Sequence, residues 1–599
     1  MARRRQPRLS QGPFTRRLRS ERHEGYTLLF ISLQMECAVA SGKIADMIGH
    51  EVAPTGADRV EVRMLDRSPS PGLLGSIVLV GRRTLNRFGI LDRVVRRDEV
   101  QTGKLFASQW GAYAEVAVQC IDENGEHTEF PSVPGLVHGR VHFPKKGALA
   151  FLGPPAIVPD QPPTAADAAI VVPFGTLPLN EDVPVGLLVD GMSRHTAIIA
   201  QSGAGKTDAM GAVLEAVLRG TQYLRALVFD PNSDFAKFDP LSVRPAGGSG
   251  EPEESSSTAG AIRFVHTEPG RQAVRKGSGC VSSVPLEMRI GGVAADVLLS
   301  LLPGAARDHI EQAQAMRMLH ILAAQPTTVP VDSVGRFLEL ASKCAEEIRG
   351  QAHLAEGKRR FDGLTNAFVE EARKHGIPQD KEAMLRLADA CLGGAKLLGG
   401  SLQSFKGIAQ RSIEGSARKP GSFREGERVQ VVDLESLNPE ERAVVAHTVV
   451  STLFNDQEAR RIDGKMPTPT LVVLDEAHYL AGASVSGRVQ ELARRIFVRI
   501  ATEGRKYGVY LLLATQRPSL LDPTVLSQVQ NVVLKTISSR ADLDALEGSL
   551  TSVTPGLIEM LPGLDKAHAI VAGPFVRMPM LVRIPRPSSV LGGKDVKIR

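Results

Sequence analysis

Two patterns of apolar residues divide the chain. Between about residues 40 and 180, apolar positions come in short runs cut by glycine and proline, as at 60–64, 76–80 and 113–118. Many short strands with close turns are typical of a small β-barrel. From about residue 183 onward, apolar runs of roughly five to seven residues alternate with longer amphipathic stretches. This alternation predicts a mostly parallel sheet flanked by helices.

These patterns predict an α/β protein in three parts, with a basic leader at 1–40, a β-barrel at 41–180 and an α/β domain at 181–599 that ends in a C-terminal tail. Two insertions interrupt the α/β domain. The stretch 246–261 is rich in Gly, Ser and Glu and is expected to be a surface loop. From about 286 to 413, apolar residues recur at helical spacing, which predicts a helical subdomain.

Length and composition favour a soluble globular protein. At 599 residues the chain exceeds what one hydrophobic core organises, so two or more domains are expected. With 43% hydrophobic and 23% charged residues, it lies near the globular average, which argues against a disordered, collagen-like or disulfide-stapled chain. The five cysteines include no C-x-x-C pair, which fits a reducing cytoplasm and argues against a zinc knuckle.

The net charge of +6 originates in the first 25 residues, which hold eight arginines and two glutamates. The rest of the chain is therefore neutral overall. Any contact with nucleic acid must come from basic groups that are concentrated locally, for instance around a pore.

The first forty residues resemble a secretory signal, with an Arg-rich start, an apolar stretch at 26–33 and small residues at 38–40. The apolar stretch is short, and polar residues interrupt its end. We therefore expect either a disordered leader or upstream sequence before a start at Met35 or Met47. No run approaches the roughly 20 apolar residues that span a bilayer, so we expect a cytoplasmic protein without a membrane segment.

The most informative segment is an apolar strand that runs into a Gly-rich turn and then a helix. It matches the phosphate-binding pattern G-x-x-x-x-G-K-[ST], except that Ala200 replaces the first glycine and leaves the entrance of the turn open to question. Gly203 and Gly205 allow backbone N–H groups to face a phosphate. Lys206 can reach the β and γ phosphates, and the Thr207 hydroxyl can ligate Mg²⁺. The expected ATP-binding residues are Ser202, Gly203, Ala204, Gly205, Lys206, Thr207 and Asp208.

A second apolar strand, at 470–474, ends in two adjacent carboxylates. We expect Asp475 to hold Mg²⁺ through water and Glu476 to polarise the attacking water as general base. A strand that ends in Asp-Glu is common by itself. Together with the phosphate loop, in this order, it predicts ATP hydrolysis.

Polar residues also follow other strands, where ligands of open parallel sheets bind. Gln516 could sense the γ-phosphate or the attacking water, or its amide could cap the loop, and both interpretations stay open. His478 has no partner motif, so a supporting or core position is favoured over catalysis. The loop 481–488 could contact DNA, with Arg488 on a phosphate, although a solvated surface loop is the default.

The ordered motifs resemble the HerA family, which belongs with the FtsK pumps among the RecA-like ring ATPases. The resemblance covers roughly 40–585. Its motifs lie at 194–195, 229–235, 431–434, 474–478, 503–508 and 514–518. It implies a RecA-like P-loop ATPase core with a helical insertion, and an N-terminal barrel of the HAS-barrel type at 41–180.

The resemblance also implies a mode of action. Members of the family form hexameric rings that pull double-stranded DNA through the centre, and they act with a separate effector. That effector is often a nuclease, or in antiphage defence a sirtuin-type NAD-consuming enzyme. Arg194 and Arg505 match arginines that reach the neighbouring subunit's nucleotide, where a guanidinium neutralises phosphoryl charge. Arg505 could instead complement a helix dipole, and for Arg194 a local role is equally open.

We therefore expect an ATP-driven hexameric ring that translocates double-stranded DNA for a separate effector, either in DNA end processing or in antiphage defence. The sequence has no convincing nuclease motif of its own. The alternative is a ring scaffold that uses ATP to assemble and activate its effector, with little translocation. The presence of Glu476 favours the motor, because a purely structural ring needs no general base.

Overall fold

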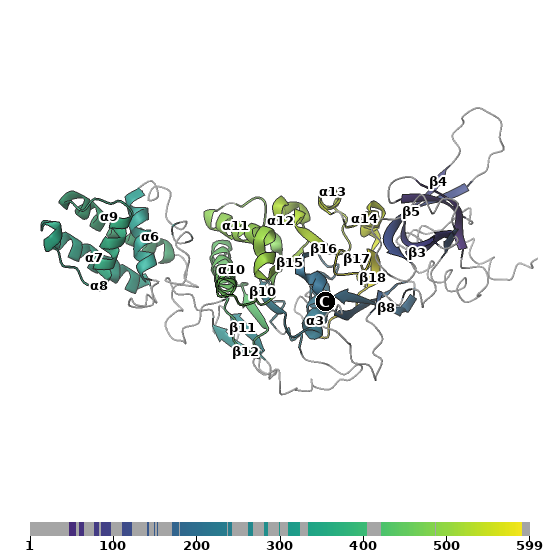
Figure 1. Ribbon diagram of the computed structural model, residues 1–599, viewed down its shortest axis with the longest axis horizontal. Helices are drawn as coiled ribbons and strands as arrows, with labels where there is room; N and C mark the ends of the chain where they lie inside the picture. The colour runs from purple at the N-terminus through teal and green to yellow at the C-terminus, as the bar shows by residue number, and fades with distance from the viewer. Residues whose placement is uncertain are drawn as a thin grey trace, which may run out of the picture. The chain divides into compact units, whose positions relative to one another are not determined.

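The chain divides into two compact units, Met1–Leu149 and Ala150–Arg599. The computed structural model (Figure 1) describes residues 47–54, 59–64, 77–82, 85–97, 111–122, 140–142, 149, 152–153, 170–178, 180–236, 238–241, 261–266, 281–285, 297, 299, 310–323, 334–403, 421–485, 487–550 and 552–589. The predicted leader at 1–40 lies outside these residues, as does the predicted loop at 246–261 apart from its last residue.

In the first unit, six strands pair into a closed barrel in the order β1-β2-β5-β4-β3-β6. The strands are β1 (Met47–Pro54), β2 (Arg59–Met64), β3 (Ile77–Arg82), β4 (Leu85–Arg97), β5 (Gly111–Asp122) and β6 (Arg140–His142). Every pairing in the barrel is antiparallel. Closure leaves no strand edge unpaired.

The second unit is built on a 12-stranded sheet in the order β12-β11-β13-β10-β14-β15-β9-β16-β17-β18-β7-β8. Its strands are β7 (Val171–Leu177), β8 (Asn180–Leu188), β9 (His195–Ile199), β10 (Arg225–Asp230), β11 (Ile262–His266), β12 (Val281–Pro285), β13 (Val429–Asp433), β14 (Thr470–Leu474), β15 (Val509–Thr515), β16 (Val529–Leu534), β17 (His568–Ala572) and β18 (Met580–Arg583). From β12 to β16 the pairs are parallel, and from β16 to β8 they are antiparallel.

The central strands are apolar on both faces because helices cover the sheet. Every residue of β9, β13 and β14 is buried, as expected for parallel strands between two helical layers. The helices of this part are α3 (Lys206–Gly220), α10 (Pro439–Ile462), α11 (Arg488–Glu503), α12 (Pro523–Ser527), α13 (Arg540–Ser549) and α14 (Pro555–Glu559), with 3₁₀ turns η4 (Val189–Ser193), η8 (Ala477–Tyr479), η9 (Gly504–Tyr507), η10 (Pro518–Leu520) and η11 (Leu561–Gly563). The helix α3 packs on β9, and α11 packs on β15 and α10. The predicted α/β P-loop fold is thus confirmed.

Helices also fill the segment for which helical spacing is expected. They are α6 (Ile310–Ala323), α7 (Val334–Gln351), α8 (Gly363–Lys374) and α9 (Lys381–Gln403), with the turn η7 (Glu356–Lys358). They pack on one another around buried side chains such as Phe337 and Phe368. A Cβ at Gly394 of α9 would lie 2.5 Å from Met316 Cγ of α6, so glycine permits the close approach of these two helices.

The structure places the boundary between the parts earlier than the predicted 180/181. The strand β7, which the sequence assigns to the barrel, pairs with β8 and β18 in the large sheet. In the sequence, the short run that contains Pro173 and Gly175 resembles a barrel strand. Its partner β18 lies some 400 residues further along the chain, so no local pattern could indicate that pairing. Among the helices that the structure describes, none is both long enough and apolar enough to cross a bilayer.

Candidate nucleotide site

The phosphate loop adopts the predicted strand, turn and helix. Gly203 and Gly205 have φ values of 75° and 85°, in the left-handed region that favours glycine, and α3 begins directly after them. Ala200 is fully buried, does not have a positive φ, and donates its N–H to the carbonyl of Thr515 at 3.2 Å. Alanine therefore fits the position where the motif has its first glycine.

The side chain of Lys206 meets both acids of the second motif. Its Nζ forms an ion pair with Asp475 and lies 3.0 Å from Glu476 Oε1. These side chains are nearly buried, with exposed fractions of 11%, 0% and 11% for Lys206, Asp475 and Glu476. Burial alone would lower the pKa of Lys206, but the two carboxylates outweigh it and raise that pKa. Residues 269 and 270 positions apart in sequence thus converge on one point.

The two acids leave β14 in different ways. Asp475 Oδ1 accepts the N–H of Glu476 at 2.9 Å, while Asp475 Oδ2 is buried and hydrogen bonds to none of the described residues. Glu476 has a φ of 46°, a left-handed conformation that is unusual for a residue with a side chain. Such strain persists where the surroundings fix it, and it is found most often at functional sites.

The residues beside the loop fit a magnesium ion. Thr207 is the second residue of α3, directly after Lys206, and its Oγ1 lies 3.5 Å from Asp234 Oδ2. The hydroxyl of Thr207 and the unbonded oxygen of Asp475 are the hard oxygen ligands that Mg²⁺ prefers. No three His, Cys, Asp or Glu side chains of the described residues form a metal site by themselves. This is consistent with Mg²⁺, which is usually held by one or two protein groups together with substrate phosphates.

Sequence reasoning gave no role to Asp234. Burial raises its pKa, and the nearby charge of Asp475 raises it further. A signal was present in the sequence, because Asp234 follows a buried strand, but its distance from Thr207 depends on how the loop folds.

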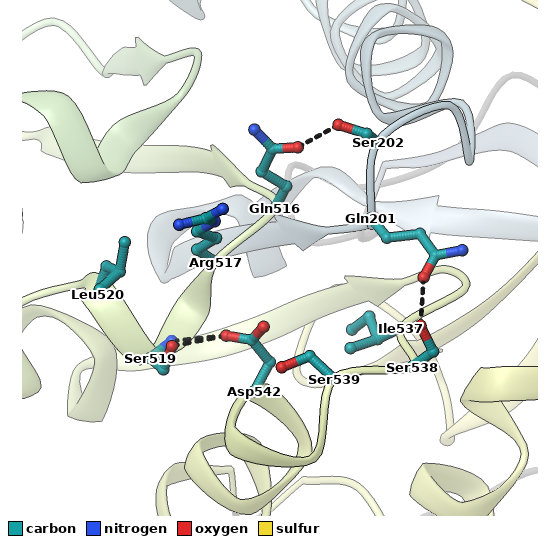
Figure 2. A pocket seen from close by; sticks show the side chains of 10 residues that line it. All are labelled: Gln201, Ser202, Gln516, Arg517, Ser519, Leu520, Ile537, Ser538, Ser539 and Asp542. Carbon is teal, nitrogen blue, oxygen red and sulfur yellow. Dashed lines mark hydrogen bonds between the residues drawn. The ribbon is translucent and has the colours of Figure 1, made fainter.

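Gln516 contacts the phosphate loop directly. Its Oε1 accepts the hydroxyl proton of Ser202 across the wall of a pocket of about 370 Å³, as Figure 2 shows. The loop after β15 is capped by Thr515, whose Oγ1 accepts the N–H of Arg517 at 3.1 Å. Gln516 therefore lies beside the phosphate loop, at the end of β15. Ser202 itself is exposed at the edge of this pocket, and Asp208 is exposed in the first turn of α3.

His478 lies beside Glu476, as expected for a supporting position. Its Nδ1 is 3.3 Å from Thr515 Oγ1 and 3.5 Å from Glu476 Oε2, an oxygen that hydrogen bonds to none of the described residues. Burial lowers the pKa of His478, and the charge of Glu476 opposes that change.

Arg194 and Arg505 lie at the opposite edge of the sheet from the phosphate loop. Arg194 precedes β9 and donates to Ser193 O and Oγ, each at 3.2 Å, while Arg505 lies in η9, just before β15. Burial raises the pKa of Tyr510 in β15, and the charges of Arg505 and Arg194 both oppose that change. At roughly 3.3 Å per residue, the five residues of β9 separate this edge from the phosphate loop by about 16 Å. Neither arginine reaches the nucleotide site of its own chain.

The candidate DNA loop is partly fixed to the segment after Gln516. Gly482 forms a β-bridge with Leu521, and Ala483 donates its N–H to Leu520 O at 2.8 Å. Arg488 is exposed at the first turn of α11. The loop is therefore joined to the segment that follows Gln516.

Comparisons with known proteins agree with this site. Residues 172–320 match the family model described as helicase HerA, central domain. A probable helicase of Methanocaldococcus jannaschii is 32% identical over 311 residues, which cover 47% of this chain and 59% of that protein. The DNA double-strand break repair helicase HerA of Sulfurisphaera tokodaii is 35% identical over 173 residues, 28% of this chain and 34% of that protein. The chain thus spans less than two thirds of either relative.

The HerA protein of Pyrococcus furiosus is 24% identical over a longer stretch, 69% of each chain. A solved structure of VirB4 of Thermoanaerobacter pseudethanolicus covers 70% of this chain and 97% of its own, with 15% identity and a TM-score of 0.40. Residues 172–320 thus match the central domain of HerA helicases, and the chain is similar to HerA proteins over longer stretches.

Proposed function

We propose that this chain hydrolyses ATP with Mg²⁺ and uses the energy to translocate double-stranded DNA as a hexameric ring, in the service of a separate effector protein. The observation that carries the proposal is the convergence of Lys206 on Asp475 and Glu476. A lysine at a phosphate loop, a buried metal-binding acid and a general base are the groups that phosphoryl transfer to water requires.

The contacts of Lys206 suggest how the site would handle its substrate. Lys206 pairs with both acids. Phosphate oxygens of ATP would compete for its ammonium group and leave Glu476 to accept a proton from the attacking water. Mg²⁺, held by Thr207 and Asp475, would neutralise charge on the β and γ phosphates. Gln516 would orient the water or the γ-phosphate after it leaves Ser202.

The positions of the two arginines support the proposed ring. Since the length of β9, about 16 Å, separates the edge of Arg194 and Arg505 from their own phosphate loop, we infer that they would act on the nucleotide of another copy. A contact between the amino edge of one copy and the carboxyl edge of the next is head to tail, and repeated rotation closes such contacts into a ring. We propose six copies on the resemblance to HerA proteins.

DNA and the effector are proposed on other grounds. The curated relatives are named DNA double-strand break repair helicases. The loop before the exposed Arg488 is joined to residues after Gln516. A change at the nucleotide would therefore be transmitted through Gln516 to this loop and to Arg488. The effector would be a nuclease or a sirtuin-type NAD-consuming enzyme on another chain. The competing proposal is a ring that activates its effector with little translocation.

The test compares wild type with Glu476→Gln, with and without linear duplex DNA, and determines the mass of the particle. We expect a hexamer whose ATPase is stimulated by DNA, and a fall of roughly 10²- to 10⁴-fold in the variant because the general base is lost. Glu370→Gln in α8, where the glutamate is half-buried, is the matched control. A monomer with DNA-independent turnover would sink the motor, and effector activation that survives Glu476→Gln would favour the scaffold.

A further inference from the structure

Asp234 is an acid beside the phosphate loop without an assigned role. It is half-buried, and its Oδ2 lies 3.5 Å from the hydroxyl oxygen of Thr207. The charges of Lys206, Asp475 and Glu476 all act on it. It therefore lies within the nucleotide site, on the side where Thr207 and Asp475 would hold the cation.

The loop that presents Asp234 is built around another carboxylate. Asp230, the last residue of β10, is fully buried and accepts three backbone N–H groups, from Asn232 at 3.3 Å, Asp234 at 3.0 Å and Phe235 at 2.8 Å. The ring of Phe235 is fully buried against Phe238. Both ends of the turn are thus anchored, and the position of Asp234 is fixed by the fold.

The same loop holds a strained backbone. Ser233 has a φ of 60°, and among the described residues only it and Glu476 combine a side chain with a positive φ. The two residues follow the neighbouring parallel strands β10 and β14. At each strand end, the unusual turn places an acid next to the phosphate loop. Backbone strain is thus present at two neighbouring strand ends, and both turns direct carboxylates toward one site. Such strain indicates that the turns serve the function of the site rather than the packing of the fold.

The charges show what that demand is. Three carboxylates, those of Asp234, Asp475 and Glu476, surround one lysine before any substrate enters. A triphosphate adds further negative charge and takes Lys206 for itself. An acid in this place repels the substrate unless a cation lies between them.

We propose that Asp234 is a positioning residue for the magnesium ion, an inference that rests on the proposed nucleotide function. A hydroxyl has one proton and two lone pairs. By accepting the proton of Thr207, Asp234 leaves the lone pairs of that oxygen free for the metal. Its other oxygen accepts from a water of the ion, because Mg²⁺ keeps several of its waters when it binds proteins.

The experiment measures how much Mg²⁺ is needed to tighten the binding of a fluorescent ADP analogue to the full chain. In wild type we expect tighter binding as Mg²⁺ is titrated. In Asp234→Asn, which keeps the shape of the side chain, we expect the half-point to rise about 10- to 100-fold, the usual cost of losing a group behind a metal ligand. In EDTA, affinity should match or exceed that of wild type, because the variant lacks a charge that repels the nucleotide. Asp239→Asn, which makes the same change in a residue that accepts the N–H of Leu241, is the control.

A second variant separates positioning from folding. With Thr207→Val, the hydroxyl is absent, so the additional effect of Asp234→Asn should shrink. An unchanged Mg²⁺ half-point in Asp234→Asn overturns the inference, as does an equal loss of affinity with Mg²⁺ and with EDTA, which would mean that the loop has collapsed. If wild type binds no ADP under either condition, the proposed function itself fails.

Discussion

The two edges of the central sheet carry opposite chemistry. At the carboxyl edge, Lys206 and two acids lie together, almost withdrawn from solvent. At the amino edge of the same strands, Arg194 is half-buried, and Arg505 is exposed. Under the proposed function, one edge has the acid, the base and the lysine of ATP hydrolysis, while the other has the guanidinium groups that phosphoryl transfer also uses.

The difference teaches that one copy of the chain holds a divided site. A parallel sheet places the starts and the ends of its strands on opposite sides, so residues before and after one strand cannot meet. The helix α11 connects the two edges, because its 16 residues extend about 24 Å from the loop after Glu476 to η9, which contains Arg505. A change at one edge can therefore be carried to the other by a rigid element.

The largest predicted effect comes from removing the exposed arginine. Arg505→Ala should lower ATPase turnover by at least about 10³-fold, the range found for an arginine supplied by a neighbouring subunit. Nucleotide affinity should stay near that of wild type, because Arg505 does not touch the site of its own chain. Turnover and fluorescent-nucleotide binding are the measurements, and Arg499→Ala, in the preceding helix α11 and also exposed, is the control.

Mixing two inactive variants sharpens that result. A copy with Lys206→Ala still carries Arg505, so it can complete the intact site of an Arg505→Ala neighbour, and mixed rings should regain part of the activity. Full activity in Arg505→Ala alone would instead support a local role for Arg505 at the end of α11.

A smaller effect is expected at the carboxyl edge from Gln516→Ala. If the amide orients the water or the γ-phosphate, its loss should reduce kcat by roughly 10²-fold, comparable to the loss of one preorganised hydrogen-bond donor. Ser202→Ala removes the hydroxyl that Gln516 accepts from but keeps the backbone N–H of the phosphate loop, so it should cost much less. A lowered melting temperature with unchanged kcat would return Gln516 to the role of a loop cap.

The carboxyl edge was easier to predict from sequence than the amino edge. The phosphate loop and Asp475–Glu476 each follow an apolar strand, and strand ends on one side of a parallel sheet gather by necessity. The distance of Arg194 and Arg505 from the loop follows from the same rule. What they contact depends on a second copy, which no local pattern describes.

Other features depend on distant pairing or on a single turn. The strands β11 and β12 pair in the sheet, but their short runs lie between Gly- and Ser-rich segments and resemble loops in the sequence. The strand β7 was assigned to the barrel because its partner β18 lies near the C-terminus. Asp234 was missed because its placement requires three hydrogen bonds to Asp230 and a left-handed Ser233.

The smallest predicted effect tests how the amino edge is held together. His195 is buried between β9, β15 and α11. Its Nδ1 accepts the N–H of Leu511 at 2.9 Å, and its Nε2–H donates to Ala501 O at 3.0 Å. These two bonds join β9, the strand after Arg194, to β15 and to the end of α11, the helix before Arg505. Burial lowers the pKa of His195 from 6.5 to about 4, although its bond to Ala501 opposes that change.

The imidazole should therefore make stability depend on pH. Between pH 6.5 and 4, the unfolded chain binds a proton that the folded chain does not, so the free energy of unfolding falls as the pH is lowered through this window. At pH 5 the loss from this one group should be roughly 2 kcal/mol relative to pH 7.5. In thermal unfolding at these two values, His195→Gln should therefore show a smaller drop in melting temperature than wild type, and the exposed His375→Gln should match wild type. If the melting temperature of His195→Gln falls as much as that of wild type, acid destabilises the chain through other groups, and His195 does not hold together the segments that carry Arg194 and Arg505.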